Sequence, residues 1–255
     1  MAINKKNQIC KLLKGIETGD PASVTVVNED KYIQHNPQTH EGSEGLAELF
    51  KRLSKTSPRV NIVRVFEDGD FVFAHTEYDF AERNIGFEIF RFEENQAIEH
   101  WDNIQKRKGP NKSAHSMIDG TTETTDHEAT ESNRRIIKSF VEDILIHNDL
   151  DKLNYYISQQ HYTEHNPEIG DDLTDLKSIL SGSNRTDLFS SDYKQCHRLL
   201  AEGNFVLSVC EGYANKTHSS FFDLYRLEDG KIVEHWDTTE AIPARSEWKN
   251  NNGKF

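Results

Sequence analysis

The hydrophobic residues of this chain are first spaced as in helices and then alternate as in strands. Over residues 4–18, four apolar side chains recur at helical spacing: Ile9, Leu12, Leu13 and Ile16. Gly19-Asp20-Pro21 ends this pattern, and its proline suits the first turn of a second, short helix. After Gly42 the spacing predicts a stronger amphipathic helix, whose apolar face consists of Leu46, Leu49, Phe50 and Leu53.

Alternating apolar and polar residues predict the strands. A short strand from Tyr32 to Asn36 precedes the amphipathic helix, and Pro37 must end it or confine it to a sheet edge. Longer strands are expected at about 59–67, 70–79, 86–93 and 96–105. Asp68-Gly69 and Glu94-Asn95 lie between successive strands and are typical of hairpin turns.

The same order of elements returns in the second half of the chain. The spacing predicts helices at about 132–148, 150–157 and 172–182, with an edge strand at 161–166 before the last of them. Four strands should follow near 193–201, 204–213, 217–228 and 231–240, with Asp229-Gly230 turning the last hairpin. Helices followed by a run of antiparallel strands are typical of an α+β fold.

Repeated motifs indicate that the two halves are copies of one domain. Glu99-His100-Trp101-Asp102 returns 135 residues later as Glu234-His235-Trp236-Asp237. Tyr32-Ile33-Gln34-His35-Asn36-Pro37 returns 130 residues later as Tyr162-Thr163-Glu164-His165-Asn166-Pro167. The offset drifts by only five residues, which small loop insertions explain. A repeat of this length is a whole folded unit. We therefore predict one domain over 1–120, a linker over 121–130 and a second domain over 131–255.

Each copy is expected to form a cone. A strongly curved antiparallel sheet with N-terminal helices across its concave side leaves a mouth, and a mouth that side chains fill incompletely is a ligand pocket. The convex side also needs a cover, which the convex side of the sister copy can provide. We therefore predict two tandem cone-shaped domains packed as a pseudo-dimer within the chain, which can be monomeric in solution.

Composition narrows the classes of partner. The 255 residues include 30 basic and 43 acidic side chains, a net charge of −13, which argues against binding to a phosphate backbone. Three cysteines without a CxxC motif do not predict a disulfide framework and fit a reducing compartment. The N-terminal residues lack the apolar region of a signal peptide, and no apolar run approaches the ~20 residues of a membrane span. We expect a cytoplasmic protein without nucleic acid or membrane partners.

The last strand of each copy carries candidate acid–base groups. Alternation along residues 98–104 places His100 and Asp102 on one face, opposite Trp101, which we interpret as a structural anchor. The preceding strand brings Glu88 alongside. Partial desolvation raises the pKa of a carboxyl group toward neutrality, so this face can transfer protons. The second copy supplies the corresponding set: His235, Asp237 and Asp223. The alternative is a structural motif, because a duplicated fold duplicates its structural residues too.

Further candidates lie where the short edge strand ends. His35-Asn36 and His165-Asn166 each precede a proline, and strand ends at a cavity mouth are common site positions. The alternative here is turn chemistry beside a surface histidine. His75 lies in the middle of a strand where copy two has Val209, so copy one is chemically richer if His75 faces the pocket. Candidates for contact with a substrate are Tyr32, Asn36, Phe90, Tyr162 and Asn166.

No metal or cofactor site is expected. His161 and His165 bracket Glu164, but HYTEH is not HExxH, and positions four apart on a strand are separated by ~13 Å. No spacing forces the histidines of copy one to converge on Asp102. The sequence also lacks GxGxxG, P-loop and GxSxG motifs. Any catalysis should therefore be cofactor-independent.

These motifs resemble the SnoaL-like proteins, a family that includes polyketide cyclases of the nuclear-transport-factor-two-like superfamily. The resemblance rests on Tyr-x-x-His-Asn-Pro and is clearest from Phe222 to Pro243. It implies the cone-shaped α+β fold and, in the characterised cyclases, a cofactor-independent intramolecular aldol reaction. The resemblance also implies that Asp102 and Asp237 match the acid/base Asp of the family. The family's His, fourteen residues earlier, is replaced here by Glu88 and Asp223.

That replacement changes the expected chemistry. One carboxylate acting as base beside another kept protonated as donor is closer to a ketosteroid-isomerase arrangement. We expect a cofactor-independent acid/base enzyme of the aldol cyclase, isomerase or dehydratase type, acting α to a carbonyl on a small apolar substrate. The catalytic candidates are Asp102, His100, Glu88, His35 and His75 in copy one, and Asp237, His235, Asp223 and His165 in copy two.

Two questions stay open at the level of sequence. The alternative to an enzyme is a non-catalytic small-molecule-binding protein of the same fold, which the replaced histidine and the unequal copies favour. Between the copies, we expect copy one to be the functional pocket and copy two to be mainly structural. The rival arrangement is two independent pockets of different specificity.

Overall fold

The chain forms two compact units that exchange segments. The computed structural model describes residues 4–53, 55, 57–181 and 190–255. Unit 1 comprises Met1–Lys106 and Ile242–Phe255, and unit 2 comprises Arg107–Ala241. The predicted domain boundaries were 1–120 and 131–255. The structure differs because residues 107–120 belong to unit 2, whereas residues 242–255 belong to unit 1. Each repeat thus contributes the segment after its last strand to the other repeat's unit.

The helices of unit 1 form where the spacing predicts them. α1 (Lys5–Thr18) begins after Asn4, whose side chain accepts a hydrogen bond from Asn7 N, and ends at Gly19, which adopts the left-handed φ of 69°. A 3₁₀ helix (Pro21–Val26) follows, and then α2 (Gly42–Leu53). The predicted apolar face of α2 includes Leu46, Leu49 and Phe50, for which the structure describes the backbone but not the side chains.

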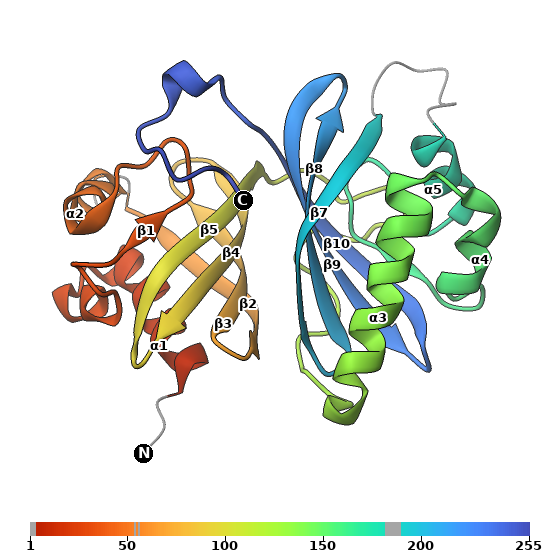
Figure 1. Ribbon diagram of the computed structural model, residues 1–255, viewed down its shortest axis with the longest axis horizontal. Helices are drawn as coiled ribbons and strands as arrows, with labels where there is room; N and C mark the ends of the chain where they lie inside the picture. Colours follow the sequence, from red (N-terminus) through yellow and green to blue (C-terminus); the bar gives the residue numbers. More distant parts are fainter. Residues whose placement is uncertain (1–3, 54, 56, 182–189) are drawn as a thin grey trace. The chain divides into compact units, whose positions relative to one another are not determined.

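Unit 1 has a five-stranded sheet in the order β1-β5-β4-β3-β2. The four long strands are antiparallel: β2 (Arg59–Asp68), β3 (Phe71–Asp79), β4 (Arg83–Glu93) and β5 (Gln96–Lys106). The short β1 (Ile33–Gln34) runs parallel to β5 at the edge, as Pro37 requires. The helices lie against one face of this sheet (Figure 1). The core between them includes Ile9, Leu12, Leu13, Val72, Phe90 and Phe92.

Unit 2 repeats this architecture with sheet order β6-β10-β9-β8-β7. Its helical elements are a 3₁₀ turn (His127–Ala129), α3 (Thr130–Phe140) with a π-helical continuation (Val141–Ile146), a 3₁₀ turn (Leu150–Lys152), α4 (Leu153–Tyr156) and α5 (Leu173–Leu180). Its strands are β6 (Thr163–Glu164), β7 (Ser191–Glu202), β8 (Phe205–Ala214), β9 (Thr217–Glu228) and β10 (Lys231–Ala241). The predicted α+β class and the tandem duplication are confirmed by the matching order of the two sheets. The packing of the copies as a pseudo-dimer stays a prediction.

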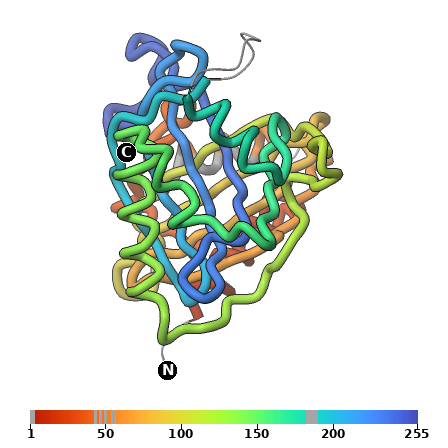
Figure 2. Tube along the Cα trace, turned by 90° about the vertical axis from the view of Figure 1, so that its right-hand side faces the viewer, coloured from red at the N-terminus to blue at the C-terminus, as the bar shows by residue number. Residues whose placement is uncertain are grey.

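The exchanged segments are held by hydrogen bonds to the edge strands. Residues 107–126 run without helix or strand toward α3 (Figure 2), and the Asn111 side chain donates to the Glu164 carbonyl (2.7 Å). In unit 1, where the returning segment contains a 3₁₀ turn (Arg245–Glu247), Asn250 donates to the Asn36 carbonyl (2.7 Å) and Asn252 to the Gln34 carbonyl (3.0 Å). Edge-strand carbonyls that would otherwise lack partners are satisfied in this way.

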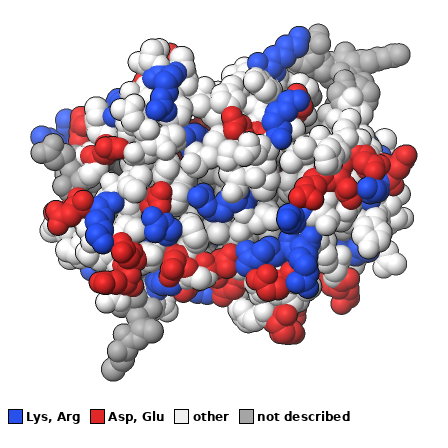
Figure 3. All heavy atoms as spheres, viewed as in Figure 1, with Lys and Arg blue, Asp and Glu red and all other residues white. Residues whose placement is uncertain are grey.

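On the face shown in Figure 3, acidic and basic side chains are interspersed, and the described residues there form no continuous basic field of the kind that binds a phosphate backbone. Among the helices of the described residues, none combines the length and the apolar composition that crossing a membrane requires.

Candidate functional site

The two repeated motifs meet because β1 runs beside β5. Their register pairs Gln34 with His100. Side chains alternate along strands, so Gln34 and Asn36 share a face with His100 and Asp102, whereas His35 points to the other face. Unit 2 repeats this register between β6 and β10. The two repeated motifs therefore form one structural unit in each copy, a pair of strands with two faces.

The histidines of the edge strands lie on the side away from the carboxylates. His35 stacks on Trp101, with ring centroids 4.6 Å apart, and its Nε2 lies 2.9 Å from Glu99 Oε1. His165 stacks in the same way on Trp236, at 4.7 Å. The prediction that His35 and His165 serve the catalytic face is therefore wrong, because a one-residue step along a strand reverses the direction of the side chain.

His75 also lies on the opposite face. It pairs with Phe87 across β3 and β4, with ring centroids 4.7 Å apart, whereas its neighbour Ala74 pairs with Glu88. Arg64 Nη1 donates to His75 Nδ1 (2.6 Å), and both side chains are buried. The prediction that His75 is a pocket donor is wrong, and the expectation that copy one is chemically richer loses its premise.

The other predicted groups of unit 1 do come together. Glu88 and Asp102 pair directly across β4 and β5, and His100 Nε2 lies 2.7 Å from Glu88 Oε2. The Tyr78 hydroxyl donates to Glu88 Oε1 (2.8 Å), and the Asn36 side chain donates to Asp102 Oδ2 (2.7 Å). Of the predicted substrate contacts, Phe90 and Tyr32 stack on His100, at 4.4 and 6.4 Å.

A lysine of the exchanged segment completes the unit 1 cluster. Lys254 Nζ donates to the Asp102 carbonyl (2.8 Å) and lies 3.6 Å from Asp102 Oδ1. Lys254 is only 4% exposed, and Asp102 is 6% exposed. A buried ammonium beside a buried carboxylate offsets part of the cost of burying either charge.

In unit 2 the corresponding histidine lies between two carboxylates. His235 Nδ1 is 2.9 Å from Glu164 Oε1, and its Nε2 is 3.2 Å from Asp223 Oδ1. Burial by itself lowers the pKa of His235, but the charge of Glu164 and the hydrogen bonds with Asp223 and Glu164 raise that pKa well above its usual value. The two carboxylates therefore favour the imidazolium form of His235. The Tyr193 hydroxyl donates to Asp223 Oδ1 (3.1 Å).

Asp237 is the perturbed acid of unit 2. The Asn166 side chain donates to its Oδ2 (2.9 Å), while its buried Oδ1 has no hydrogen-bond partner among the described residues. Burial raises the pKa of Asp237 to about 7. The charges of Asp223 and Glu164 act in the same direction, whereas those of His235 and the bond from Asn166 oppose them. The carboxyl group is therefore poised near neutral pH.

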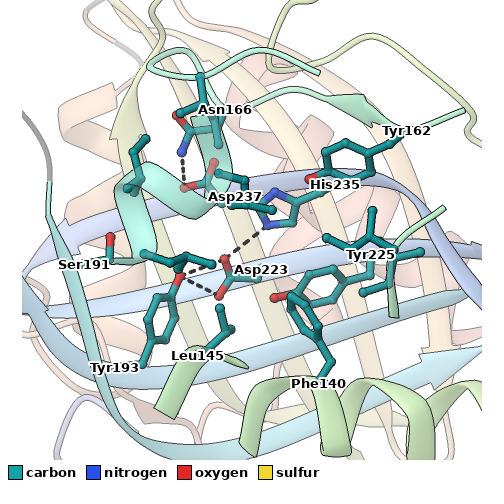
Figure 4. A pocket seen from close by; sticks show the side chains of 16 residues that line it. Phe140, Leu145, Tyr162, Asn166, Ser191, Tyr193, Asp223, Tyr225, His235 and Asp237 are labelled. Atoms are coloured by element: carbon teal, nitrogen blue, oxygen red, sulfur yellow. Dashed lines mark hydrogen bonds and ion pairs between the residues drawn. The ribbon is translucent and has the colours of Figure 1, made fainter. Parts of the chain in front are cut away.

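Asp237 opens onto a largely apolar cavity. The cavity is narrow, is partly open to solvent, and lies between the helices and the sheet of unit 2. Figure 4 shows Asp237, His235, Asp223, Tyr193 and Tyr225 around it. Apolar side chains form the rest of the wall: Phe140, Leu145, Ile157, Ile169, Leu176, Ile179, Leu180 and Ile232. Two predicted substrate contacts, Tyr162 and Asn166, also line it.

Several residues of the two clusters were not among the predicted ones. The same alternation that locates His100 would have found Gln34 and Glu164, because they pair directly with His100 and His235. The tyrosines that bond the carboxylates lie on strands whose register the sequence leaves open. Lys254 gives no signal, because only the exchange of segments brings it to Asp102.

Each unit is an α+β domain with a mostly antiparallel five-stranded sheet, helices on one face and buried acid–base groups between the layers. The chain is similar to TsrD from Streptomyces laurentii, with 19% identity, 39% of this chain and 86% of that chain covered, and a TM-score of 0.35. It is also similar to IdmH, a candidate polyketide cyclase from Streptomyces antibioticus (13% identity, 40% and 93% covered, TM-score 0.37).

A further similar structure is a nuclear-transport-factor-two-like protein of unknown function from Cytophaga hutchinsonii (14% identity, 41% and 93% covered, TM-score 0.35). No protein-family model matches the sequence, and neither does any curated protein. At these identities and TM-scores the similarity carries no information about activity, so function must be inferred from the site.

Proposed function

We propose that unit 2 is a cofactor-independent acid/base catalyst that removes a proton α to a carbonyl group of a small apolar substrate. The observation that carries this proposal is Asp237. One of its oxygens is fixed by Asn166, the other has no hydrogen-bond partner among the described residues, and its pKa is raised to about 7 at the wall of an apolar cavity. A base is most effective when its pKa lies near the working pH.

The neighbouring groups supply what the reaction needs next. When the Asp237 carboxylate takes the α-proton, the electron pair moves onto the carbonyl oxygen and forms an enolate. Tyr225 lines the same cavity, and because burial raises its pKa well above 10.0, its hydroxyl stays protonated and can donate to that oxygen. The positive charge of His235 favours the developing negative charge. Protonated Asp237 then returns the proton to the same carbon or to another one.

The reacting groups are held in place by neighbours that are themselves fixed. His235 is bonded on both ring nitrogens, and Glu164 accepts further hydrogen bonds from the Tyr162 hydroxyl (2.5 Å) and the backbone of Asn166 (2.9 Å). Little reorganisation is therefore needed when charge moves, which is the basis of electrostatic preorganisation. Enolisation is the step that aldol cyclisation, isomerisation and dehydration share, so the final product depends on the substrate.

The test is deuterium exchange at the α-carbon of small cyclic ketones. The full-length protein is incubated with a panel of cyclohexenones and tetralones in D₂O, and incorporation is followed by NMR. We expect exchange that rises with pH through a midpoint near 7, because the base must be ionised. Asp237→Asn should reduce the rate by about 10²–10⁴-fold, as for loss of a general base.

The control is Asp102→Asn, the matched change in unit 1, which should leave exchange within a few fold of the original rate. Exchange that persists in Asp237→Asn and stops in Asp102→Asn would move the activity to unit 1. Ketones that bind the cavity without any Asp237-dependent exchange would leave the alternative of a non-catalytic binding protein.

A further inference from the structure

The unit 1 cluster has the geometry of a cation site. Glu88, His100 and Asp102 are each at least nine-tenths buried, with 4%, 7% and 6% exposure. One ligand atom from each lies within 4.8 Å of the other two. Among the described residues, this is the one set of three such side chains that gathers so closely. A buried imidazole with two carboxylates is a donor set that divalent transition metals use.

Each of the three side chains is fixed from outside. One atom of each has a polar partner: Tyr78 for Glu88 Oε1 (2.8 Å), Gln34 for His100 Nδ1 (3.1 Å) and Asn36 for Asp102 Oδ2 (2.7 Å). The remaining atoms are Glu88 Oε2, His100 Nε2 and Asp102 Oδ1. Outer partners of this kind orient metal ligands in proteins.

The histidine is set in the tautomer that a metal requires. The backbone N–H of Asn36 donates to Gln34 Oε1 (2.9 Å), which identifies that atom as an acceptor. His100 Nδ1 must therefore carry the proton that it shares with Gln34, and Nε2, which lies 2.7 Å from Glu88 Oε2, is the nitrogen that binds a metal once the proton between these two atoms is released. In unit 2 the residue at this position is Glu164, and both ring nitrogens of His235 face carboxylate oxygens.

Lys254 supplies a positive charge at the same place. Its Nζ lies 3.6 Å from Asp102 Oδ1, an oxygen that accepts no hydrogen bond within 3.5 Å from the described residues. The lysine comes from residues 242–255, which the chain adds to unit 1 after completing unit 2. An ammonium on a flexible side chain can withdraw, whereas the three ligands sit on adjacent strands.

We propose that Glu88, His100 and Asp102 form a binding site for a divalent transition metal such as Zn²⁺, and that Lys254 is a tethered cation that competes for it. Zinc bonds of about 2.0–2.2 Å place neighbouring ligand atoms roughly 3.4 Å apart. The ligand atoms need shifts of roughly an ångström, and the 2.7 Å contact between His100 and Glu88 must open slightly. The site is independent of the function proposed for unit 2.

The test is a Zn²⁺ titration of the full-length protein by calorimetry in the presence of a competing chelator. Lys254→Met should bind Zn²⁺ more tightly than the original protein, by at least about tenfold, because the competing charge is gone. Asp102→Asn and Glu88→Gln should each weaken binding by at least about tenfold. Co²⁺ should give the visible absorption of a four- or five-coordinate site in Lys254→Met, and that absorption should be lost in Lys254→Met/Glu88→Gln.

Surface histidines bind zinc adventitiously, so matched controls are needed. His218→Gln removes an exposed imidazole bonded to Glu211 in unit 2, and Asp237→Asn removes the corresponding acid there. Both should bind Zn²⁺ as the original protein does. Equal affinities in the original protein, Lys254→Met and Glu88→Gln would overturn the proposal. The gain expected for Lys254→Met keeps the test decisive if Asp102→Asn fails to fold.

Discussion

The two units place the same Asp on the same strand but surround it with different charges. In both, a carbonyl of the exchanged segment faces the edge-strand histidine: Gly253 O with His35 and Ser116 O with His165. The next residue is Lys254 in unit 1 and Met117 in unit 2, and both are buried. Both acids keep an Oδ1 without a hydrogen-bond partner among the described residues, but Asp102 Oδ1 has the Lys254 ammonium 3.6 Å away, whereas the corresponding residue of unit 2, Met117, is uncharged. The comparison teaches that a segment outside the sheet can set the electrostatics of a site on it.

A second difference shows that the units keep a hydrogen bond while changing its source. In unit 1 the hydroxyl that bonds the β4 carboxylate comes from Tyr78, which pairs with Val60. In unit 2 it comes from the neighbouring strand, from Tyr193, which pairs with Gly212. The residue that lies beside the tyrosine ring also differs between the two units. A Cβ at Gly86 would lie 2.5 Å from the Tyr78 ring.

At the position of that glycine, unit 2 has Phe221, whose ring packs against Tyr193 with centroids 4.3 Å apart. Three positions thus change together in the two units, and the bond from a phenol to a carboxylate survives. A hydroxyl donor at this carboxylate is therefore kept in both units, although it comes from a different strand in each.

The largest expected effect is that two matched substitutions change the free energy of unfolding of their own units in opposite directions. Asp102→Asn should destabilise unit 1 by about 3–5 kcal/mol, because it leaves Lys254 buried without its charged partner. Asp237→Asn should stabilise unit 2 at pH 8, by up to roughly 4 kcal/mol, because a buried carboxylate with a raised pKa no longer has to ionise. Hydrogen exchange followed by mass spectrometry measures the two units separately.

The stability gain expected for Asp237→Asn depends on pH, because Asp237 has different pKa values in the folded and unfolded states. The folded state of unit 2 holds the Asp237 proton up to a pH of about 7, whereas the unfolded chain releases it near 3.8. The gain from Asp237→Asn should therefore be absent below pH 4, grow between pH 4 and 7, and stay constant above. The same stability change at pH 4 and pH 8 would contradict the raised pKa.

The next prediction tests whether residue 117 of the exchanged segment controls the pKa of Asp237. Met117→Lys brings into unit 2 the charge that unit 1 has at Lys254. It should lower the pKa of Asp237 from about 7 by about 1–3 units and move the midpoint of deuterium exchange down with it. NMR titration of the Asp carboxyl carbon measures the shift. Met117→Leu is the matched control, and an unchanged midpoint in both variants would mean that residue 117 does not act on Asp237.

The smallest expected effect comes from removing the tyrosine hydroxyl that bonds the carboxylate in each unit. Tyr78→Phe and Tyr193→Phe each remove one hydrogen bond to a buried carboxylate and should each cost about 1.5–3 kcal/mol in their own unit. Similar losses are expected because the bond is the same although its strand is not. Urea unfolding with unit-resolved hydrogen exchange measures both. A loss confined to one unit would show that only that unit depends on the bond.

Periodicity accounts for what the sequence predicts correctly. Alternation along 98–104 places His100 and Asp102 together, and the register of the last hairpin brings Glu88 to them. The prediction for His75 is wrong because the face on which it lies depends on the loop between β3 and β4. In that loop Ala81 adopts a φ of 89°, and β4 begins at Arg83 rather than at the predicted 86. Loop geometry of this kind has no signal in the pattern of hydrophobic residues.

His35 was placed on the wrong face and Lys254 was not among the predicted residues, for different reasons. The alternation that separates His100 from Trp101 applies equally to the edge strand, so the direction of His35 follows once its pairing with β5 is known. Lys254 reaches Asp102 across 152 residues of sequence. Local spacing cannot predict a contact that depends on the exchange of the two closing segments.

The exchange of segments also fixes the order in which the units can be completed during synthesis. Residues 1–106 leave the ribosome before the 135 residues of unit 2, and the segment 242–255 follows only after them. At 5–20 residues per second, unit 1 waits roughly 7–30 s for Asn250, Asn252 and Lys254, which bond Asn36, Gln34 and Asp102. Unit 2 receives its own closing segment, 107–120, before its body is made. The first unit to emerge is therefore the last to be finished, and its open edge strand is exposed to other chains for that interval.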